Sequence, residues 1–128
     1  MKKLIMLATA LLVTVAAHAG PYPDITVDQL KTAIAAKEVT LLDVNGSASW
    51  KSGHIPGAID FAANKAKLAS LLPKDKNALV VAYCGGPACS AYAAAAKAAK
   101  ELGYKNVKHL SAGISGWKAA GEKTNPGT

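Results

Sequence analysis

The segment from residue 79 to residue 91 constrains the fold of this chain more than any other. It reads L-V-V-A-Y-C-G-G-P-A-C-S-A: an apolar run that stops at Cys84, a short Gly-rich stretch, and the start of an Ala-rich segment. This order predicts a buried strand, a tight loop and a helix. A thiol at such a turn lies where backbone N–H groups and a helix N-terminus can stabilise an anionic sulfur. The loop is therefore the first candidate for a chemical site.

The beginning of the chain has the pattern of a cleavable export signal. Two lysines precede an apolar stretch at residues 4–15, and a small-residue A-x-A cleavage site ends at Ala19. The stretch is shorter than the roughly 20 residues that span a bilayer, although an uncleaved anchor is the alternative. We expect residues 1–19 to be a signal peptide and residues 20–128 to be one domain. The mature protein would then be periplasmic, with no stable membrane anchor.

The charge of the expected mature chain is mildly positive. Residues 20–128 hold thirteen lysines against eight acidic residues, a net charge of +5, and the whole chain has no arginine. The lysines are scattered and are not interleaved with aromatic residues, so we expect no nucleic-acid partner. A mild basic field of this kind attracts small anions.

Strand-like and helix-like segments alternate through the domain. We expect helices at about residues 26–37, 47–51, 64–72, 89–102 and 113–120, and strands at about residues 39–44, 58–61, 78–83 and 107–110. This alternation predicts an α/β domain with a mostly parallel central sheet and helices on both faces. Ligands of such sheets bind beyond the carboxyl ends of the strands, which is where Cys84 falls.

Cys84 is the candidate nucleophile, with an inert buried cysteine as the alternative. Gly85 and Gly86 can adopt the φ values that turn N–H groups inward, and Pro87 stiffens the loop while lacking an N–H of its own. We expect such a loop to lower the pKa of the thiol. Cysteine phosphatases need C-x5-R, but the sixth residue after Cys84 is Ser90. The pattern therefore excludes phosphate chemistry, and the shorter loop suits one extra sulfur atom carried on the thiol.

The second cysteine, Cys89, lies in the same loop. Two cysteines in an exported protein usually form a disulfide, but a Cys84–Cys89 bridge closes a small ring and constrains little of the unfolded chain. A structural role for such a bridge is therefore a poor explanation. Zinc is also disfavoured, because C-x4-C lacks the usual C-x2-C spacing even with His54 and His109 as further ligands. We expect no metal. His54 and Asp43 are more readily explained as structural residues.

Four ordered motifs resemble those of single-domain rhodanese-like sulfurtransferases. They are L-L-D-V at residues 41–44, W-K-S-G-H-I-P-G-A-I at residues 50–59, V-V-A-Y-C at residues 80–84, and L-S-A-G-I-S-G-W at residues 110–117 with Gly121 behind it. Each motif alone is weak, but together and in order they are specific. The resemblance covers about residues 24–124.

The resemblance implies a sulfur-transfer reaction through a Cys84 persulfide. Cys84 would take the sulfane sulfur of a small anionic donor such as thiosulfate and pass it to cyanide, a thiol or a partner protein. It implies no metal or organic cofactor. The residues implied to hold the terminal sulfur are Gly85, Gly86, Pro87, Ala88, Cys89 and Ser90.

The chain departs from the family pattern at three positions near the site. Asn45 stands where many members have an arginine, Ser49 where a glutamate is common, and Cys89 where active members often have an arginine. Cys89 is therefore a candidate resolving thiol, which would release sulfide from the Cys84 persulfide and leave a reversible disulfide. Two other functions stay open: a non-catalytic persulfide carrier that serves a partner protein, and a thiol–disulfide redox protein.

Overall fold

The computed structural model describes residues 21–128, and the expected signal peptide lies outside the described residues. The strands are β1 (Val39–Asp43), β2 (Ile59–Asp60), β3 (Leu79–Tyr83) and β4 (Asn106–His109). The helices are α1 (Val27–Ala35), α2 (Ser47–Ser52), α3 (Phe61–Asn64), α4 (Leu68–Leu71), α5 (Tyr92–Glu101) and α6 (Gly113–Ala119), with a 3-10 turn, η1 (Lys65–Lys67), between α3 and α4. Within the described part of the chain, no helix has both the length and the apolar character needed to cross a bilayer.

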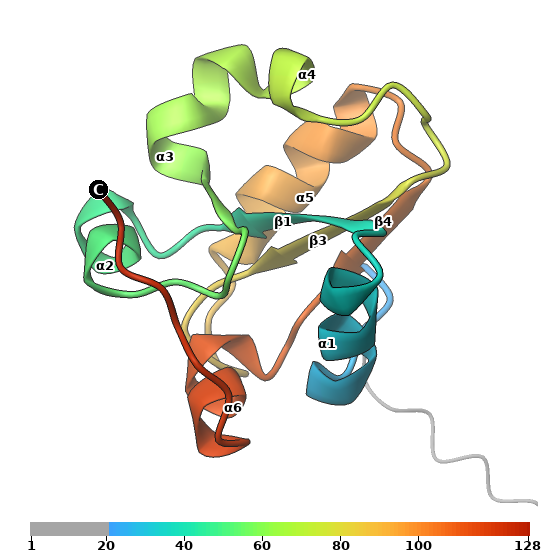
Figure 1. Cartoon of the computed structure of the whole chain (residues 1–128). Helices are drawn as coiled ribbons and strands as arrows, with labels where there is room; N and C mark the ends of the chain where they lie inside the picture. The colour runs from blue at the N-terminus through green and yellow to red at the C-terminus, as the bar shows by residue number, and fades with distance from the viewer. Residues whose placement is uncertain (1–20) are drawn as a thin grey trace, which may run out of the picture.

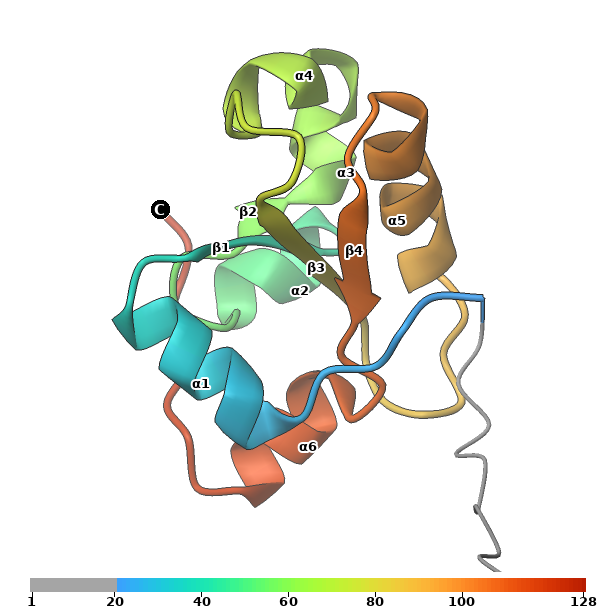
Figure 2. The same ribbon diagram turned by 90° about the vertical axis from the view of Figure 1, so that its right-hand side faces the viewer.

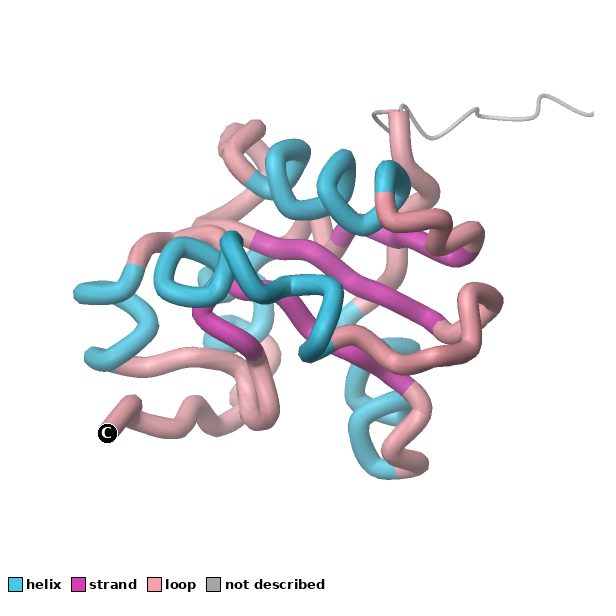
Figure 3. Tube along the Cα trace, turned by 90° about the horizontal axis from the view of Figure 1, so that it is seen from above, coloured by secondary structure: helices cyan, strands magenta, loops and turns pink. Residues whose placement is uncertain are grey.

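The four strands form one parallel sheet in the order β2-β1-β3-β4, with helices on both faces (Figure 1). Helices α3, α4 and α5 lie on one side of the sheet, and α1 and α6 lie on the other (Figure 2). Figure 3 shows the strands running through the middle of the molecule between these helical layers. The predicted α/β architecture is confirmed.

Strand β3 supplies the core on both faces of the sheet. Its side chains alternate between the faces, as the period of two in a strand requires. Val80 and Ala82 join the cluster that includes α5, whereas Val81 and Tyr83 join the cluster that includes Trp117 of α6. All four strand residues are fully buried. This double burial explains why the segment reads as a continuous apolar run rather than as an alternating pattern.

The Ala-rich helix α5 packs directly on the sheet through its small side chains. Ala95, Ala96 and Ala99 have no exposed surface, and the helix contacts β3 and β4. Gly103 follows the helix end with φ +95°, a left-handed conformation that glycine adopts without steric cost. The helix predicted here is confirmed, but it begins at Tyr92 rather than at Cys89 or Ser90. Ser90 and Ala91 instead accept hydrogen bonds from the N–H groups three residues ahead, in a tight turn.

The predicted helix at residues 64–72 was wrong in its extent. The chain forms three short turns, α3, η1 and α4, and the first begins earlier than predicted, where Asp60 Oδ1 accepts a hydrogen bond from Ala63 N–H. Phe61 and Leu68 are both buried in the same cluster.

The order of the strands creates a crevice next to Cys84. The chain goes from β1 to β2 on one side and then crosses to β3 on the other side of β1. The loops that leave the carboxyl ends of β1 and β3 therefore diverge, and such a switch point is the usual ligand site of an open α/β sheet. The loop after β1 carries Asn45, and the loop after β3 begins with Cys84.

Candidate active site

Cys84 directly follows β3 and is almost completely buried, with 1% of its surface exposed. The carbonyl oxygen of Cys84 accepts a hydrogen bond of 3.0 Å from Ile114 N–H, and that of Gly85 accepts one of 3.0 Å from Ser115 N–H. Ile114 and Ser115 belong to the first turn of α6. The cysteine loop, which we define as residues 84–90, is therefore held by the sheet at one end and by α6 along its first two residues.

Gly113 controls how closely α6 approaches the cysteine loop. It has φ +61°, and a Cβ there would lie 2.5 Å from the carbonyl carbon of Gly85 and from the nitrogen of Gly86. Only glycine fits this contact without displacing the loop. Reasoning from the sequence did not assign Gly113 to the site. The sequence did contain a signal for this role, because Gly113 is part of the motif at residues 110–117.

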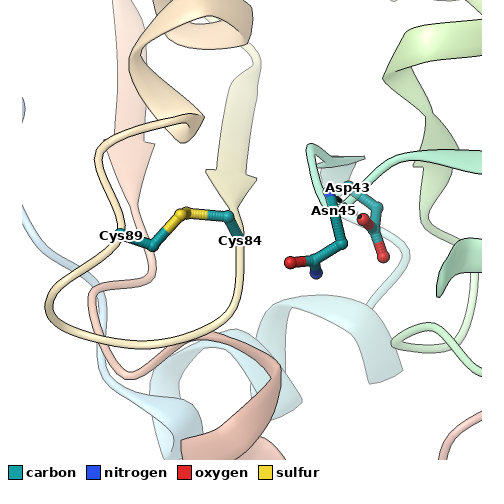
Figure 4. The surroundings of a disulfide bond; sticks show 4 residues. All are labelled: Asp43, Asn45, Cys84 and Cys89. Atoms are coloured by element: carbon teal, nitrogen blue, oxygen red, sulfur yellow. Dashed lines mark hydrogen bonds between the residues drawn. A yellow bond between two sulfur atoms is a disulfide. The ribbon is translucent and has the colours of Figure 1, made fainter.

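In the structure Cys84 and Cys89 form a disulfide, with their Cα atoms 6.3 Å apart (Figure 4). Cys89 is half-buried and packs against the cluster that contains Tyr92. The ring spans only five residue steps, so it removes little conformational entropy from the unfolded chain. The bond does show that the two sulfur atoms reach each other within the folded loop.

The cysteine loop leaves several backbone donors without a partner. The N–H groups of Gly85, Gly86, Ala88 and Ser90 donate to no acceptor within residues 21–128, whereas Cys89 N–H donates to Gly86 O at 3.0 Å. Pro87, Ala88 and Ser90 are exposed, and Gly85 and Gly86 are half-buried. The structure thus brings all the predicted loop residues together beside Cys84. Four of them offer an N–H to an anion.

A buried hydrogen-bond network fixes the ends of β1 and β3 relative to each other. Tyr83 Oη donates to Asp43 Oδ2 at 2.6 Å and accepts from Ile55 N–H at 3.0 Å. Asp43 Oδ1 accepts from Asn45 N–H at 2.8 Å, so the carboxylate holds the backbone of the loop after β1, which fits the structural role expected of it. Burial is the main cause that raises the pKa of Tyr83 well above its usual range, and the hydrogen bond to Asp43 raises it further. Tyr83 therefore remains a neutral donor and helps to hold in place the strand end from which Cys84 extends.

Replacing Tyr83 with phenylalanine is expected to lower the free energy of unfolding by about 1–3 kcal/mol, because Ile55 N–H and Asp43 then lose a buried partner. Urea unfolding measures the change. Tyr22→Phe is the matched control, since the Tyr22 hydroxyl makes no hydrogen bond within the described residues. That control should stay within about 0.5 kcal/mol of the wild type. Equal effects of the two substitutions would contradict this role of Tyr83.

The two described histidines lie outside the cysteine loop. His54 Nδ1 lies 2.8 Å from Trp50 O, and its ring stacks on the Trp50 indole, which fits the structural role expected of it. His109 stacks on Tyr92, and burial lowers its pKa despite the nearby Asp24. Within residues 21–128, no three His, Cys, Asp or Glu side chains cluster in a way that could hold a metal ion.

Comparison with known proteins gives a consistent result at the level of the family. A family model described as Rhodanese-like domain matches residues 26–120. The thiosulfate sulfurtransferase GlpE of Shewanella oneidensis is 31% identical over 102 residues, which cover 77% of this chain and 95% of that protein. The HTH-type transcriptional regulator Rv0324 of Mycobacterium tuberculosis is 36% identical over 109 residues, which cover 84% of this chain. The match spans only 47% of the regulator.

Solved structures with the same fold agree with this result. The solution structure of the rhodanese-like domain of Alr3790 from Anabaena has a TM-score of 0.65 and 25% identity, over 81% of this chain and 79% of that one. SseA from Escherichia coli, described as a 3-mercaptopyruvate sulfotransferase, has a TM-score of 0.64 and 20% identity, over 82% of this chain and 50% of that one. At 20% identity the likeness to SseA concerns the fold alone.

Proposed function

This chain belongs to the rhodanese-like domain family, and we propose that it is a sulfurtransferase that carries sulfur as a persulfide on Cys84. The observation that carries the proposal is the position of Cys84 at the carboxyl end of β3, followed by a loop in which four N–H donors have no acceptor within residues 21–128. Such donors stabilise a terminal persulfide anion without acid–base catalysis. The 31% identity to a thiosulfate sulfurtransferase, over 95% of that protein's length, also supports the proposed sulfurtransferase function.

The proposed reaction has two half-reactions. The Cys84 thiolate attacks the sulfane sulfur of thiosulfate, the S–S bond of thiosulfate breaks, and sulfite leaves with the bonding electron pair. Cys84 then carries a persulfide anion. A thiophilic acceptor such as cyanide attacks the terminal sulfur, which leaves as thiocyanate and regenerates the Cys84 thiolate. Because the oxidised loop has no free thiolate at Cys84, the cycle starts only after the disulfide is reduced.

A steady-state assay tests this proposal. The pre-reduced protein is mixed with thiosulfate and cyanide, and the formation of thiocyanate and sulfite is followed together. Equal amounts of the two products over many turnovers would support the enzyme. A persulfide that forms once and then persists would instead identify a carrier. If the protein exchanges disulfides with a dithiol but takes no sulfur from any donor, the sulfurtransferase proposal fails and a thiol–disulfide redox function takes its place.

We further propose that Cys89 is a resolving thiol, because the structure joins it to Cys84. The Cys89 thiolate attacks Cys84 Sγ of the protonated persulfide, Cys84–S–SH, and the bond from Cys84 Sγ to the terminal sulfur breaks. The terminal sulfur leaves with the bonding electron pair and its proton as hydrosulfide. The two cysteines are oxidised to the disulfide, and the sulfane sulfur is reduced to sulfide. An external dithiol then returns both cysteines to thiols. We propose that export, as expected from residues 1–19, puts this cycle in a compartment where disulfides persist.

Replacing Cys89 with serine is expected to lengthen the life of the Cys84 persulfide at least about tenfold when no acceptor is present, since the intramolecular attack is lost. The measurement loads the reduced protein with one equivalent of thiosulfate, then follows sulfide release and the intact mass. The wild type should release sulfide and form the disulfide. A persulfide that decays at the same rate in both proteins would show that Cys89 does not resolve it.

A further inference from the structure

The two ends of the Cys84–Cys89 disulfide differ in their burial. Cys84 is 1% exposed and belongs to the core cluster on the α5 side of the sheet. Cys89 is half-buried and lies between two exposed residues, Ala88 and Ser90. Figure 4 shows Cys84 on the arm of the cysteine loop that leaves β3 and Cys89 on the arm that leads to α5. In the oxidised loop, solvent therefore reaches the Cys89 end of the bond far more readily than the Cys84 end.

Reduction of a disulfide by an external thiol depends on which sulfur the attacking thiolate can reach. The thiolate approaches one sulfur along the line of the S–S bond, from the side away from the other sulfur. Attack on Cys84 Sγ is blocked, because Cys84 has almost no exposed surface while the disulfide is intact. Attack on Cys89 Sγ can come from the outer side of the loop.

The surroundings of the two cysteines also favour one direction of bond cleavage. The N–H groups of Gly85 and Gly86, directly after Cys84, have no acceptor within residues 21–128, so they can donate to a thiolate released there. The start of α5 lies nearer to Cys89 and is partly occupied, because Ala93 N–H already donates at 3.1 Å to a carbonyl oxygen of the preceding turn. A thiolate that is better stabilised leaves faster. Cys84 is therefore the better leaving group.

Charge within this segment does not decide the direction of attack. Residues 77–96 contain no charged side chain, so the segment neither attracts a thiolate to one sulfur nor repels it from the other. The two cysteines thus differ in access and in the stabilisation of the leaving thiolate. Both differences favour attack on Cys89.

We propose that the external thiol reductant of this disulfide enters at Cys89. The reductant's thiolate forms a bond to Cys89 Sγ, the bond between Cys89 and Cys84 breaks, and Cys84 leaves as a thiolate with the bonding electron pair. When the reductant is a dithiol, its second thiolate attacks the reductant sulfur of the mixed disulfide, and Cys89 leaves as a thiolate. The dithiol is oxidised to a disulfide, and the two cysteines are reduced by the same two electrons.

This inference rests on the proposed sulfurtransferase function, because it assigns the thiol partner that completes that cycle. It gives Cys89 two tasks at two stages, first to attack the persulfide and then to receive the reductant. Cys84 is released directly as the thiolate that the first half-reaction needs. Reduction and activation of the nucleophile are then one step.

The site of attack can be mapped on the oxidised wild-type protein. An excess of reduced glutathione is added, and the reaction is stopped early with acid and N-ethylmaleimide, before the mixed disulfide can rearrange. Tandem mass spectrometry then locates both labels from fragments that separate the two cysteines. Glutathione on Cys89 with maleimide on Cys84 should be at least about tenfold more abundant than the reverse pattern. Equal amounts, or an excess of the reverse pattern, would overturn the proposal.

The same reaction in concentrated urea is the matched control, because unfolding exposes both cysteines. The preference for Cys89 should then fall to within about twofold. A preference of the same size in the unfolded chain would come from the local sequence and not from the fold, which also overturns the proposal.

Sulfur transfer is measured separately, as the turnover of the fully reduced protein with thiosulfate and cyanide. Glutathione on Cys89 without any turnover would support the entry site for the reductant and overturn the sulfurtransferase. Turnover with glutathione on Cys84 would overturn the entry site and leave the sulfurtransferase intact.

Discussion

Sulfur transfer by the Cys84→Ser protein is expected to fall to the uncatalysed background, a loss on the order of a thousandfold or more. The hydroxyl of serine is not ionised at neutral pH and cannot carry a persulfide, so neither half-reaction has its nucleophile. The change is nearly isosteric at a site that is 1% exposed, so the fold should remain. Thiocyanate formation from thiosulfate and cyanide measures the loss, and circular dichroism checks the fold.

The matched control for this prediction is Cys89→Ser, which also removes the disulfide but keeps the proposed nucleophile. Under reducing conditions this variant should retain turnover with cyanide, because the acceptor, and not Cys89, removes the sulfur. If the two variants lose activity equally, the assignment of separate roles to the two cysteines is wrong. If Cys84→Ser stays active, Cys84 is not the persulfide carrier.

The Gly113→Ala protein is expected to be less stable than the wild type by about 2–5 kcal/mol. A non-glycine residue at φ +61° costs about 1–2 kcal/mol, and the clash of its Cβ with backbone atoms of Gly85 and Gly86 only 2.5 Å away adds about 1–3 kcal/mol. Relief of the overlap would move the cysteine loop, so turnover should fall together with stability. Urea unfolding and the thiocyanate assay, applied to the same preparation, measure the two effects.

Gly121→Ala separates the two causes of this expected loss. Gly121 has φ +80°, but among the described residues no heavy atom outside Gly121 and its two chain neighbours lies within 4 Å of the position that a Cβ would take. The variant should therefore lose only about 1–2 kcal/mol and keep its activity. Equal losses of stability in the two variants would mean that the close contact between α6 and the cysteine loop does not contribute to the loss in Gly113→Ala.

The strand, loop and helix around Cys84 could be predicted because their signals are local. The apolar run at Val80 to Tyr83 and the alanines of α5 each specify one element without reference to the rest of the chain. The loop residues between them were predicted together for the same reason. The parallel sheet followed from the alternation of strands and helices along the chain.

The features that could not be predicted depend on contacts between distant residues. Tyr83 meets Asp43 across 40 residues, and the backbone at Gly113 meets the backbone at Gly85 across 28 residues. A pocket beside Asn45 likewise needs α2 and α6 to be brought together. The breaks in the predicted helix at residues 64–72 were not predicted either, because residues 65–67 form a 3-10 turn inside a segment whose apolar pattern suits a continuous helix.

The most direct test of the persulfide on Cys84 is the intact mass of the reduced protein after one addition of thiosulfate, followed by peptide mapping. Using the Cys89→Ser variant prevents early loss of the sulfur. We predict a gain of one sulfur atom on the peptide that contains Cys84, and its complete loss as thiocyanate when cyanide is added. An unchanged mass, or a sulfur found on any other residue, would contradict a persulfide carried by Cys84.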